Sequence, residues 1–254
     1  MHKVALEKAK ELKLNVKYEC KVTGVFDDAD RNQLGLPVNS FVNGAVPVEL
    51  LISENKSNQF DMHVLADLRK ATLRAKHLGW QKDAGVPATL NVDIISNKEG
   101  GVSLTNMKLD GRDLTVRGDI QMDETHQVTS FSFPNISYKV LSNIHVEGAL
   151  NNKKIWQISA GGKTFDGRGL LKSLLRTGKV GAGGKAKDLS KGIDLKAEFD
   201  TVLGWKQSKL SRFKINMSRR GDVMTDFKIK GTLLNGGSLT GNLVSGKNAA
   251  PVIR

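Results

Sequence analysis

The chain has 254 residues, of which 39% are hydrophobic and 26% charged, and its formal net charge is +13 at pH 7. This composition excludes a disordered chain, because disordered chains are poorer in apolar residues. No run of about 18 apolar residues could form a membrane-spanning helix. The single cysteine, Cys20, excludes a disulfide framework and a thiolate zinc site. The positive charge predicts an anionic partner such as nucleic acid, lipid headgroups or lipopolysaccharide, unless it serves only to keep the protein soluble.

The N-terminal stretch MHKVALEKAKELKLN lacks the unbroken apolar segment of a secretory signal peptide. If the protein works outside the cytoplasm, we expect its targeting segment to lie elsewhere. The chain would then be a fragment of a longer protein.

Alternation of apolar and polar residues is the dominant pattern along the chain. In LNVKYECKV (14–22) every second side chain is apolar, as in a strand with one buried face. The pattern returns at 114–122, 144–150, 193–199 and 223–229, with weaker copies between them. Turn sequences such as NKEGG, LDGRD and SRRGD separate these runs. The sequence therefore predicts an all-β protein, an antiparallel meander of roughly a dozen strands.

One amphipathic helix interrupts this pattern, because four leucines recur on one helical face between residues 170 and 175. A basic, glycine-rich stretch without periodicity follows and reads as a flexible linker. The predicted organisation is a β module at 1–177 ending in the helix (about 165–177), a linker at 178–187, and a continuation of the meander at 188–254.

Two short motifs begin like ligand sites but lack residues that those sites need. The letters GKT at 162–164 close the pattern of a phosphate-binding loop, yet Gln157 stands where that loop needs its first glycine. The stretch DADRNQLGLPVN at 28–39 starts like a calcium loop, but Gln33 replaces the glycine of the sharp turn and Asn39 the closing glutamate. We predict a polar loop between strands there, and neither a metal nor another cofactor.

Catalytic groups do not assemble in the sequence. The five histidines are scattered, and none shares a short motif with a carboxylate or a nucleophile. Cys20 continues the apolar face of the first strand, as a small core residue would. The sequence therefore favours a protein that is not an enzyme.

The nucleic-acid interpretation of the charge is weakened by the aromatic residues. Single-strand binders interleave aromatic with basic side chains to stack bases. Aromatic residues make up only 6% here, and Phe131, Phe133 and Phe227 fall on apolar faces or beside apolar residues. Nucleic acid is not expected as a partner, and a basic nucleic-acid-binding β protein is the less favoured alternative.

A dozen strands with one apolar face must hide that face in one of three ways. Two sheets can stack as a sandwich, or the sheet can close as a barrel. The sheet can also curl into an open groove whose apolar lining is covered by bound lipid. Physical cost alone favours the sandwich, because an exposed apolar groove is unfavourable.

Three segments resemble the central region of large AsmA-like proteins, the YhdP-like group. They are LGWQKDAGVPATLNVDI (78–94), the segment 104–138 and the segment 146–175, and the likeness runs from about residue 40 to the C-terminus. The matching motif positions are Leu114, Val116, Gly118 and Ile120, then Trp156, Ile158, Gly161, Thr164, Phe165, Asp166, Gly167, Arg168, Leu170 and Leu171. In that family GGKTFDGR turns from the sheet into a short helix.

The resemblance implies a bridge-like lipid transport protein, with a helix in the inner membrane and a long periplasmic β-groove that carries phospholipid acyl chains. It implies that this chain is a periplasmic fragment of an AsmA-like protein anchored in the inner membrane, with phospholipid as its ligand. Membrane contact would come through the missing parts, and other envelope proteins are a further expected partner class. The sequence departs from the family in lacking the anchoring helix and the usual C-terminal portion.

The expected fold is an extended, curved antiparallel β-meander that forms a groove, with one short amphipathic helix. The alternative is a closed β-sandwich that serves as a structural or interaction module of the cell envelope, in which the same apolar residues form an ordinary core. The candidate lipid-binding residues of the groove are Val16, Tyr18, Val22, Val116, Ile120, Ile144, Val146, Ile193, Leu195, Phe199, Phe227 and Ile229.

Overall fold

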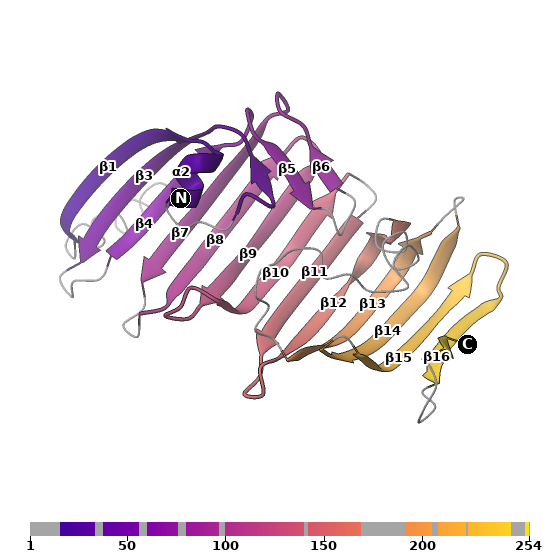
Figure 1. Cartoon of the computed structure of the whole chain (residues 1–254). Coiled ribbons are helices and arrows are strands. Elements are labelled where there is room, and N and C mark those ends of the chain that lie inside the picture. The colour runs from indigo at the N-terminus through magenta and orange to yellow at the C-terminus, as the bar shows by residue number, and fades with distance from the viewer. Residues whose placement is uncertain are drawn as a thin grey trace, which may run out of the picture. The chain divides into compact units, whose positions relative to one another are not determined.

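The computed structural model describes residues 16–33, 38–55, 60–75, 80–96, 100–139, 142–168, 191–204, 208–221, 223–244 and 252–253. Strands dominate these ranges, and the described elements include a single short helix, α2 (Asp28–Gln33). The predicted all-β class is confirmed (Figure 1). The strands in the first half of the chain are β1 (Val16–Phe26), β2 (Val42–Asn43), β3 (Val46–Asn55), β4 (Phe60–Asp67), β5 (Thr72–Ala75), β6 (Trp80–Lys82), β7 (Ala88–Ser96), β8 (Val102–Gly111) and β9 (Leu114–Met122). Those in the second half are β10 (Val128–Tyr138), β11 (Ser142–Leu150), β12 (Ile155–Asp166), β13 (Gly192–Leu203), β14 (Lys209–Arg220), β15 (Val223–Leu233), β16 (Ser238–Val244) and β17 (Val252–Ile253).

The long strands pair in chain order, as a meander does. Their hydrogen-bonded order is β1-β3-β4-β7-β8-β9-β10-β11-β12-β13-β14-β15-β16-β17, and β2, β5 and β6 form a separate three-stranded sheet. The order is linear, so the sheet is open, and it is curved in both parts of the chain (Figure 1). The antiparallel meander is the arrangement that the alternating pattern predicted, and the open, curved sheet is the one that the family resemblance implied.

One strand pair departs from the antiparallel rule. β12 and β13 are parallel, with Trp156 opposite Ile193 and Ile158 opposite Leu195. A parallel pair needs a crossover connection of a dozen or more residues, and residues 167–191 provide that length. The meander after residue 188 therefore continues in the same sheet.

The first residues of the helix predicted at about 165–177 belong to a strand instead, because β12 extends to Asp166. Phe165 and Asp166 are the last residues of that strand. The leucines at 170–175 and the linker at 178–187 lie outside the described residues.

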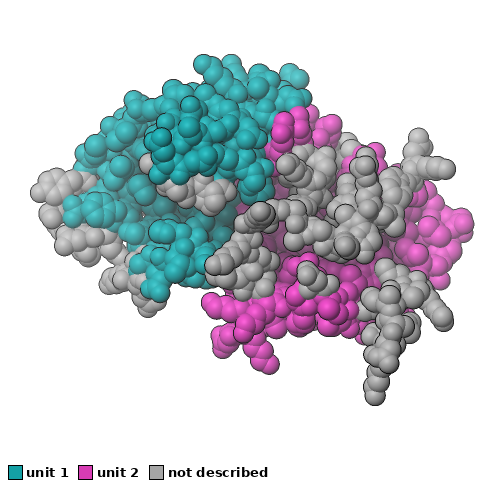
Figure 2. All heavy atoms as spheres, in the orientation of Figure 1, with its two compact units in different colours: residues 1–73, 82–112, 118–129 teal, residues 74–81, 113–117, 130–254 magenta. Residues whose placement is uncertain are grey.

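The chain divides into two compact units (Figure 2). Unit 1 comprises residues 1–73, 82–112 and 118–129, and unit 2 comprises residues 74–81, 113–117 and 130–254. The division falls around β9 and not at the glycine-rich stretch 178–187. Each unit has a small apolar core of its own.

The buried apolar residues of unit 1 come from β3, β4, β5, β7 and residues 68–71 between β4 and β5. The amino group of Lys82, which is 7% exposed, donates to the carbonyl oxygens of Ala71 (2.7 Å), Asp83 (3.0 Å) and Val86 (2.9 Å). Burial lowers the pKa of Lys82, opposed by the charges of Asp83 and Asp67, and the three carbonyls satisfy all its donors. The buried apolar side chains of unit 1 are Val46, Ala66, Leu68, Ala71, Leu73, Ala88 and Val92.

The core of unit 2 gathers around one ring pair. Phe165 and Phe199 are stacked with their centroids 5.0 Å apart, and Phe199 is 7% exposed. Ala197 and Val202 are the other buried members of this cluster. The partly buried residues packed against it are Ile144, Ala160, Phe165, Leu195, Leu210, Phe213 and Ile215.

The stretch predicted as a polar loop at 28–39 contains helix α2 instead. Asp27 precedes the helix, and its Oδ1 accepts from the backbone N–H groups of Ala29 (2.8 Å) and Asp30 (3.0 Å). These bonds satisfy donors that a helix N-terminus leaves unpaired, and they lower the pKa of Asp27. A local cap, which alternation does not reveal, therefore explains the difference.

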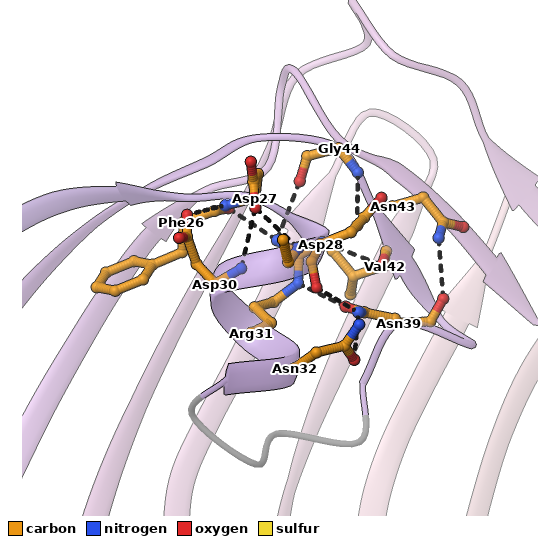
Figure 3. A network of polar contacts seen from close by, with 11 residues as sticks. Phe26, Asp27, Asp28, Asp30, Arg31, Asn32, Asn39, Val42, Asn43 and Gly44 are labelled. Atoms are coloured by element: carbon orange, nitrogen blue, oxygen red, sulfur yellow. Dashed lines mark hydrogen bonds and ion pairs between the residues drawn. The ribbon is translucent and has the colours of Figure 1, made fainter.

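Arg31 joins α2 to the segment that follows it (Figure 3). Its side chain is 6% exposed, and its guanidinium donates to Asn39 Oδ1 (2.8 Å) and to the Asp28 carboxylate. It also donates to the carbonyl oxygens of Phe26 (2.8 Å) and Gly44 (3.0 Å). The planar guanidinium thus joins the end of β1 to the start of β3.

Candidate functional site

Cross-strand pairing places apolar residues side by side on one face of unit 1. Directly paired residues share a face of a sheet, so the register alone defines the rows. One row consists of Cys20, Ile52, Met62, Ile94 and Leu104. The next consists of Val22, Leu50, Val64 and Val92.

Unit 2 carries three apolar rows on one face. The first consists of Phe131, Gly148, Ile158, Leu195, Met217 and Phe227. The second consists of Phe133, Val146, Ala160, Ala197, Ile215, Ile229 and Gly241. The third lies at the strand ends and consists of Leu150, Trp156, Ile193, Arg219 and Met224.

The opposite face of unit 1 is more polar. His63 Nδ1 lies 2.6 Å from Asp93 Oδ1, and Asn106 donates to Asp93 Oδ2 (2.8 Å). Burial opposes ionisation of Asp93, but the hydrogen bonds from His63 and Asn106 outweigh it, so the pKa of Asp93 is lowered. The described residues include no group of three or more side chains suited to hold a metal ion.

Most of the apolar face is only partly covered. Val22 is 39% exposed, and Val146, Met217 and Ile229 are partly exposed. In the described part of the chain, ten apolar residues are buried, seven in unit 1 and three in unit 2. Two stacked sheets would bury the inner rows of both. The apolar rows in each unit therefore reach solvent over most of their length.

Aromatic side chains on this face pack against one another. The Phe131 ring lies 5.5 Å from that of Trp156 and 5.8 Å from that of Phe133. It also covers Gly148, where an added Cβ would lie 2.5 Å from the ring. These rings therefore pack on one another while remaining partly exposed.

The predicted site residues fall into three groups. The side chains of Val16 and Tyr18 lie outside the described part of the structure. Phe199 belongs to the buried cluster of unit 2, and Ile144 and Leu195 pack against it. The remaining candidates are partly or fully exposed and comprise Val22, Val116, Ile120, Val146, Ile193, Phe227 and Ile229.

The sequence analysis did not predict two features of this face. Arg219 stands in the third apolar row of unit 2, opposite Ile193 and Met224, although SRRGD reads as a turn. Gly162 stands opposite Ile144 with φ at +149°, and an added Cβ there would overlap the Asn143 carbonyl oxygen. The paired glycines at 161–162 were the one sign in the sequence of this close backbone approach at Gly162.

A charged cluster crosses the polar side of the same strands. The guanidinium of Arg220 lies 2.7 Å from Asp194 Oδ1 and donates to Asp194 Oδ2 (3.0 Å), and Gln157 donates to Oδ2 (2.9 Å). The hydrogen bond from Arg220 is the main reason that the pKa of Asp194 lies well below its usual range, despite opposing desolvation. This pair joins β13 to β14.

No family model, curated protein or solved structure matches the chain. The described helices include none that is long and apolar enough to cross a bilayer. The strand order and the registers define the chain as an open, all-β protein in which each unit carries a partly exposed apolar face.

Proposed function

We propose that this chain is a lipid-binding segment of a periplasmic, bridge-like lipid transport protein of the AsmA-like type. Its apolar face binds phospholipid acyl chains, and in the longer protein it helps to conduct lipid between inner and outer membranes. The observation that carries the proposal is the set of continuous apolar rows that stay partly exposed in each unit.

Acyl chains suit such a face because hydrophobic contact is not directional. Each methylene removed from water contributes about 0.8 kcal/mol. A row such as Val146, Ile215 and Ile229 runs across neighbouring strands and offers an acyl chain many equivalent apolar contacts. Binding of this kind holds a chain without fixing it at one point, as a conduit requires.

The closed-sandwich alternative needs a second layer over these rows. In unit 1, Leu68, Ala71 and Leu73 are buried, whereas Val22 in an apolar row stays exposed. Partial exposure of the rows favours an external apolar ligand, so lipid binding is the better supported function.

Binding of a soluble short-chain phospholipid tests the proposal. Val146 and Ile229 lie in the second apolar row of unit 2 but outside the buried cluster, so charges there should disturb the fold least. The double variant Val146→Asp, Ile229→Asp should weaken binding about tenfold or more, because the carboxylates must be desolvated beneath acyl chains. Isothermal titration with diheptanoyl phosphatidylcholine below its micelle concentration measures the change.

The matched control places the same charges on the other face. Ser159 and Asn216 are exposed and pair with Lys196 on either side. Ser159→Asp, Asn216→Asp should bind lipid as the wild type does. Equal loss in both double variants, with folding intact by circular dichroism, would contradict binding on the apolar face.

A further inference from the structure

Cationic residues meet at one end of three neighbouring strands of unit 2. The basic edge consists of Lys153, Lys154, Lys191 and Arg219. The backbone N–H of Lys191 donates to the carbonyl oxygen of Lys154 (2.6 Å), and that of Gly221 donates to the carbonyl oxygen of Lys191 (3.2 Å). The β11–β12 turn, the start of β13 and the end of β14 are therefore side by side.

Arg219 connects this edge to the apolar face. It pairs with Ile193, which pairs with Trp156, so the three residues share the face that carries the apolar rows. Its Nε is shut off from solvent and has no hydrogen-bond partner among the described residues. Arg219 as a whole is partly exposed at this boundary, so its guanidinium can donate to an anionic oxygen from outside the protein.

Among the described residues, the Asp194 carboxylate on β13 does not cancel the positive charge of the basic edge. Asp194 is held on both oxygens by Arg220 and is therefore already neutralised. The side chains of Lys153, Lys154 and Lys191 are exposed and form no ion pair with another described residue. At the opposite ends of these strands, Arg168 is paired with Asp166 at 2.5 Å.

We infer that the basic edge binds the phosphate group of an anionic phospholipid whose acyl chains lie on the third apolar row of unit 2. The inference rests on the proposed function and adds a preference for headgroup charge. The Arg219 guanidinium contacts the phosphate at the boundary of the apolar face, and the lysines supply the surrounding positive field. Arginine suits this position because its planar group donates two parallel hydrogen bonds to a phosphate.

Two short-chain lipids with identical acyl chains test the inference on the purified 254-residue chain. Diheptanoyl phosphatidylglycerol should bind about tenfold more tightly than diheptanoyl phosphatidylcholine at low salt. The preference should fall as salt is raised, because salt screens exposed charges. The triple variant Lys153→Gln, Lys191→Gln, Arg219→Gln should bind both lipids with affinities within about twofold of each other.

The control removes the same charge from the polar face. Lys163, Lys196 and Lys230 are exposed on β12, β13 and β15. Their triple replacement by Gln should leave the headgroup preference intact. Loss of the preference in this control would show an effect of net charge alone and overturn the inference.

The remaining outcomes separate the inference from the proposed function. Equal binding of both lipids by the wild type would overturn the basic edge and leave acyl-chain binding standing. Failure of both lipids to bind would overturn both. Displacement of the anionic lipid by equimolar inorganic phosphate would identify a site for free phosphate and overturn the lipid headgroup as its ligand.

Discussion

Gly162 shows how one residue can set the course of a strand. Its φ of +149° is rarely adopted by residues with a side chain, and an added Cβ would also lie 2.8 Å from the Ile144 Cα atom. The backbone of the neighbouring strand cannot give way cheaply, because it is held in the ladder between β11 and β12. The glycine of the GKT letters, which the sequence excludes from a phosphate loop, is thus required by packing.

Replacement of Gly162 by alanine should lower the free energy of unfolding by about 3 kcal/mol, through backbone strain and the contact with Asn143. Gly221 is the control, because its φ is +54° and an added Cβ would have no neighbour within 4 Å. Gly221→Ala should cost only about 1 kcal/mol. Urea unfolding of both variants measures the difference, and equal costs would contradict the close contact at Gly162.

Asp194 should make stability depend on acid. Its pKa is lowered in the folded protein, chiefly by the hydrogen bond from Arg220, so folding favours the ionised carboxyl. That contribution is fully present above the unfolded pKa of about 3.9 and is lost as pH falls below it. Asp194→Asn should therefore cost about 1 kcal/mol at pH 7, a modest value because the pair is partly exposed to solvent.

Thermal unfolding at pH 7, 5 and 3 checks this sign. The difference between wild type and Asp194→Asn should be the same at pH 7 and 5 and should shrink at pH 3. A difference that grows toward pH 3 would contradict the lowered pKa.

At the scale of elements, α2 depends on one buried guanidinium. Arg31 donates to side chains and carbonyls that belong to β1, α2 and the segment before β3. Lysine has the same charge but cannot reproduce the planar arrangement of donors. Arg31→Lys should lower the free energy of unfolding by about 2–3 kcal/mol, because buried acceptors lose their partners.

The exposed Arg69 is the matched control for this substitution. Arg69→Lys should change stability by less than about 0.5 kcal/mol. Thermal unfolding measured by circular dichroism compares the two, and similar melting temperatures for both variants would argue against the network in Figure 3 as a stabilising element.

The strands could be predicted from sequence because alternation reports one-sided burial directly. Val22, Val146 and Ile229 all lie on the face that their spacing predicted. The parallel pair of β12 and β13 could not be predicted, because it depends on contacts between segments far apart in the chain. The place of Arg219 in an apolar row was hidden for the same reason, since only the register reveals its neighbours.

At the scale of the whole molecule, the open sheet leaves its apolar rows without a covering layer among the described residues. The linear strand order provides no second long sheet in the described chain. The buried clusters, with Val92 in one unit and Phe199 in the other, account for only part of each apolar face. A chain built this way gains stability when an apolar ligand covers the rest, so lipid should raise its melting temperature by mass action.

Native mass spectrometry of the purified chain, with extraction and identification of bound lipid, tests the central claim most directly. We predict copurified phospholipid that is lost in the Val146→Asp, Ile229→Asp variant and retained in the Ser159→Asp, Asn216→Asp control. A stable wild-type chain that carries no lipid and takes up none when phospholipid is added would contradict lipid binding on the apolar face.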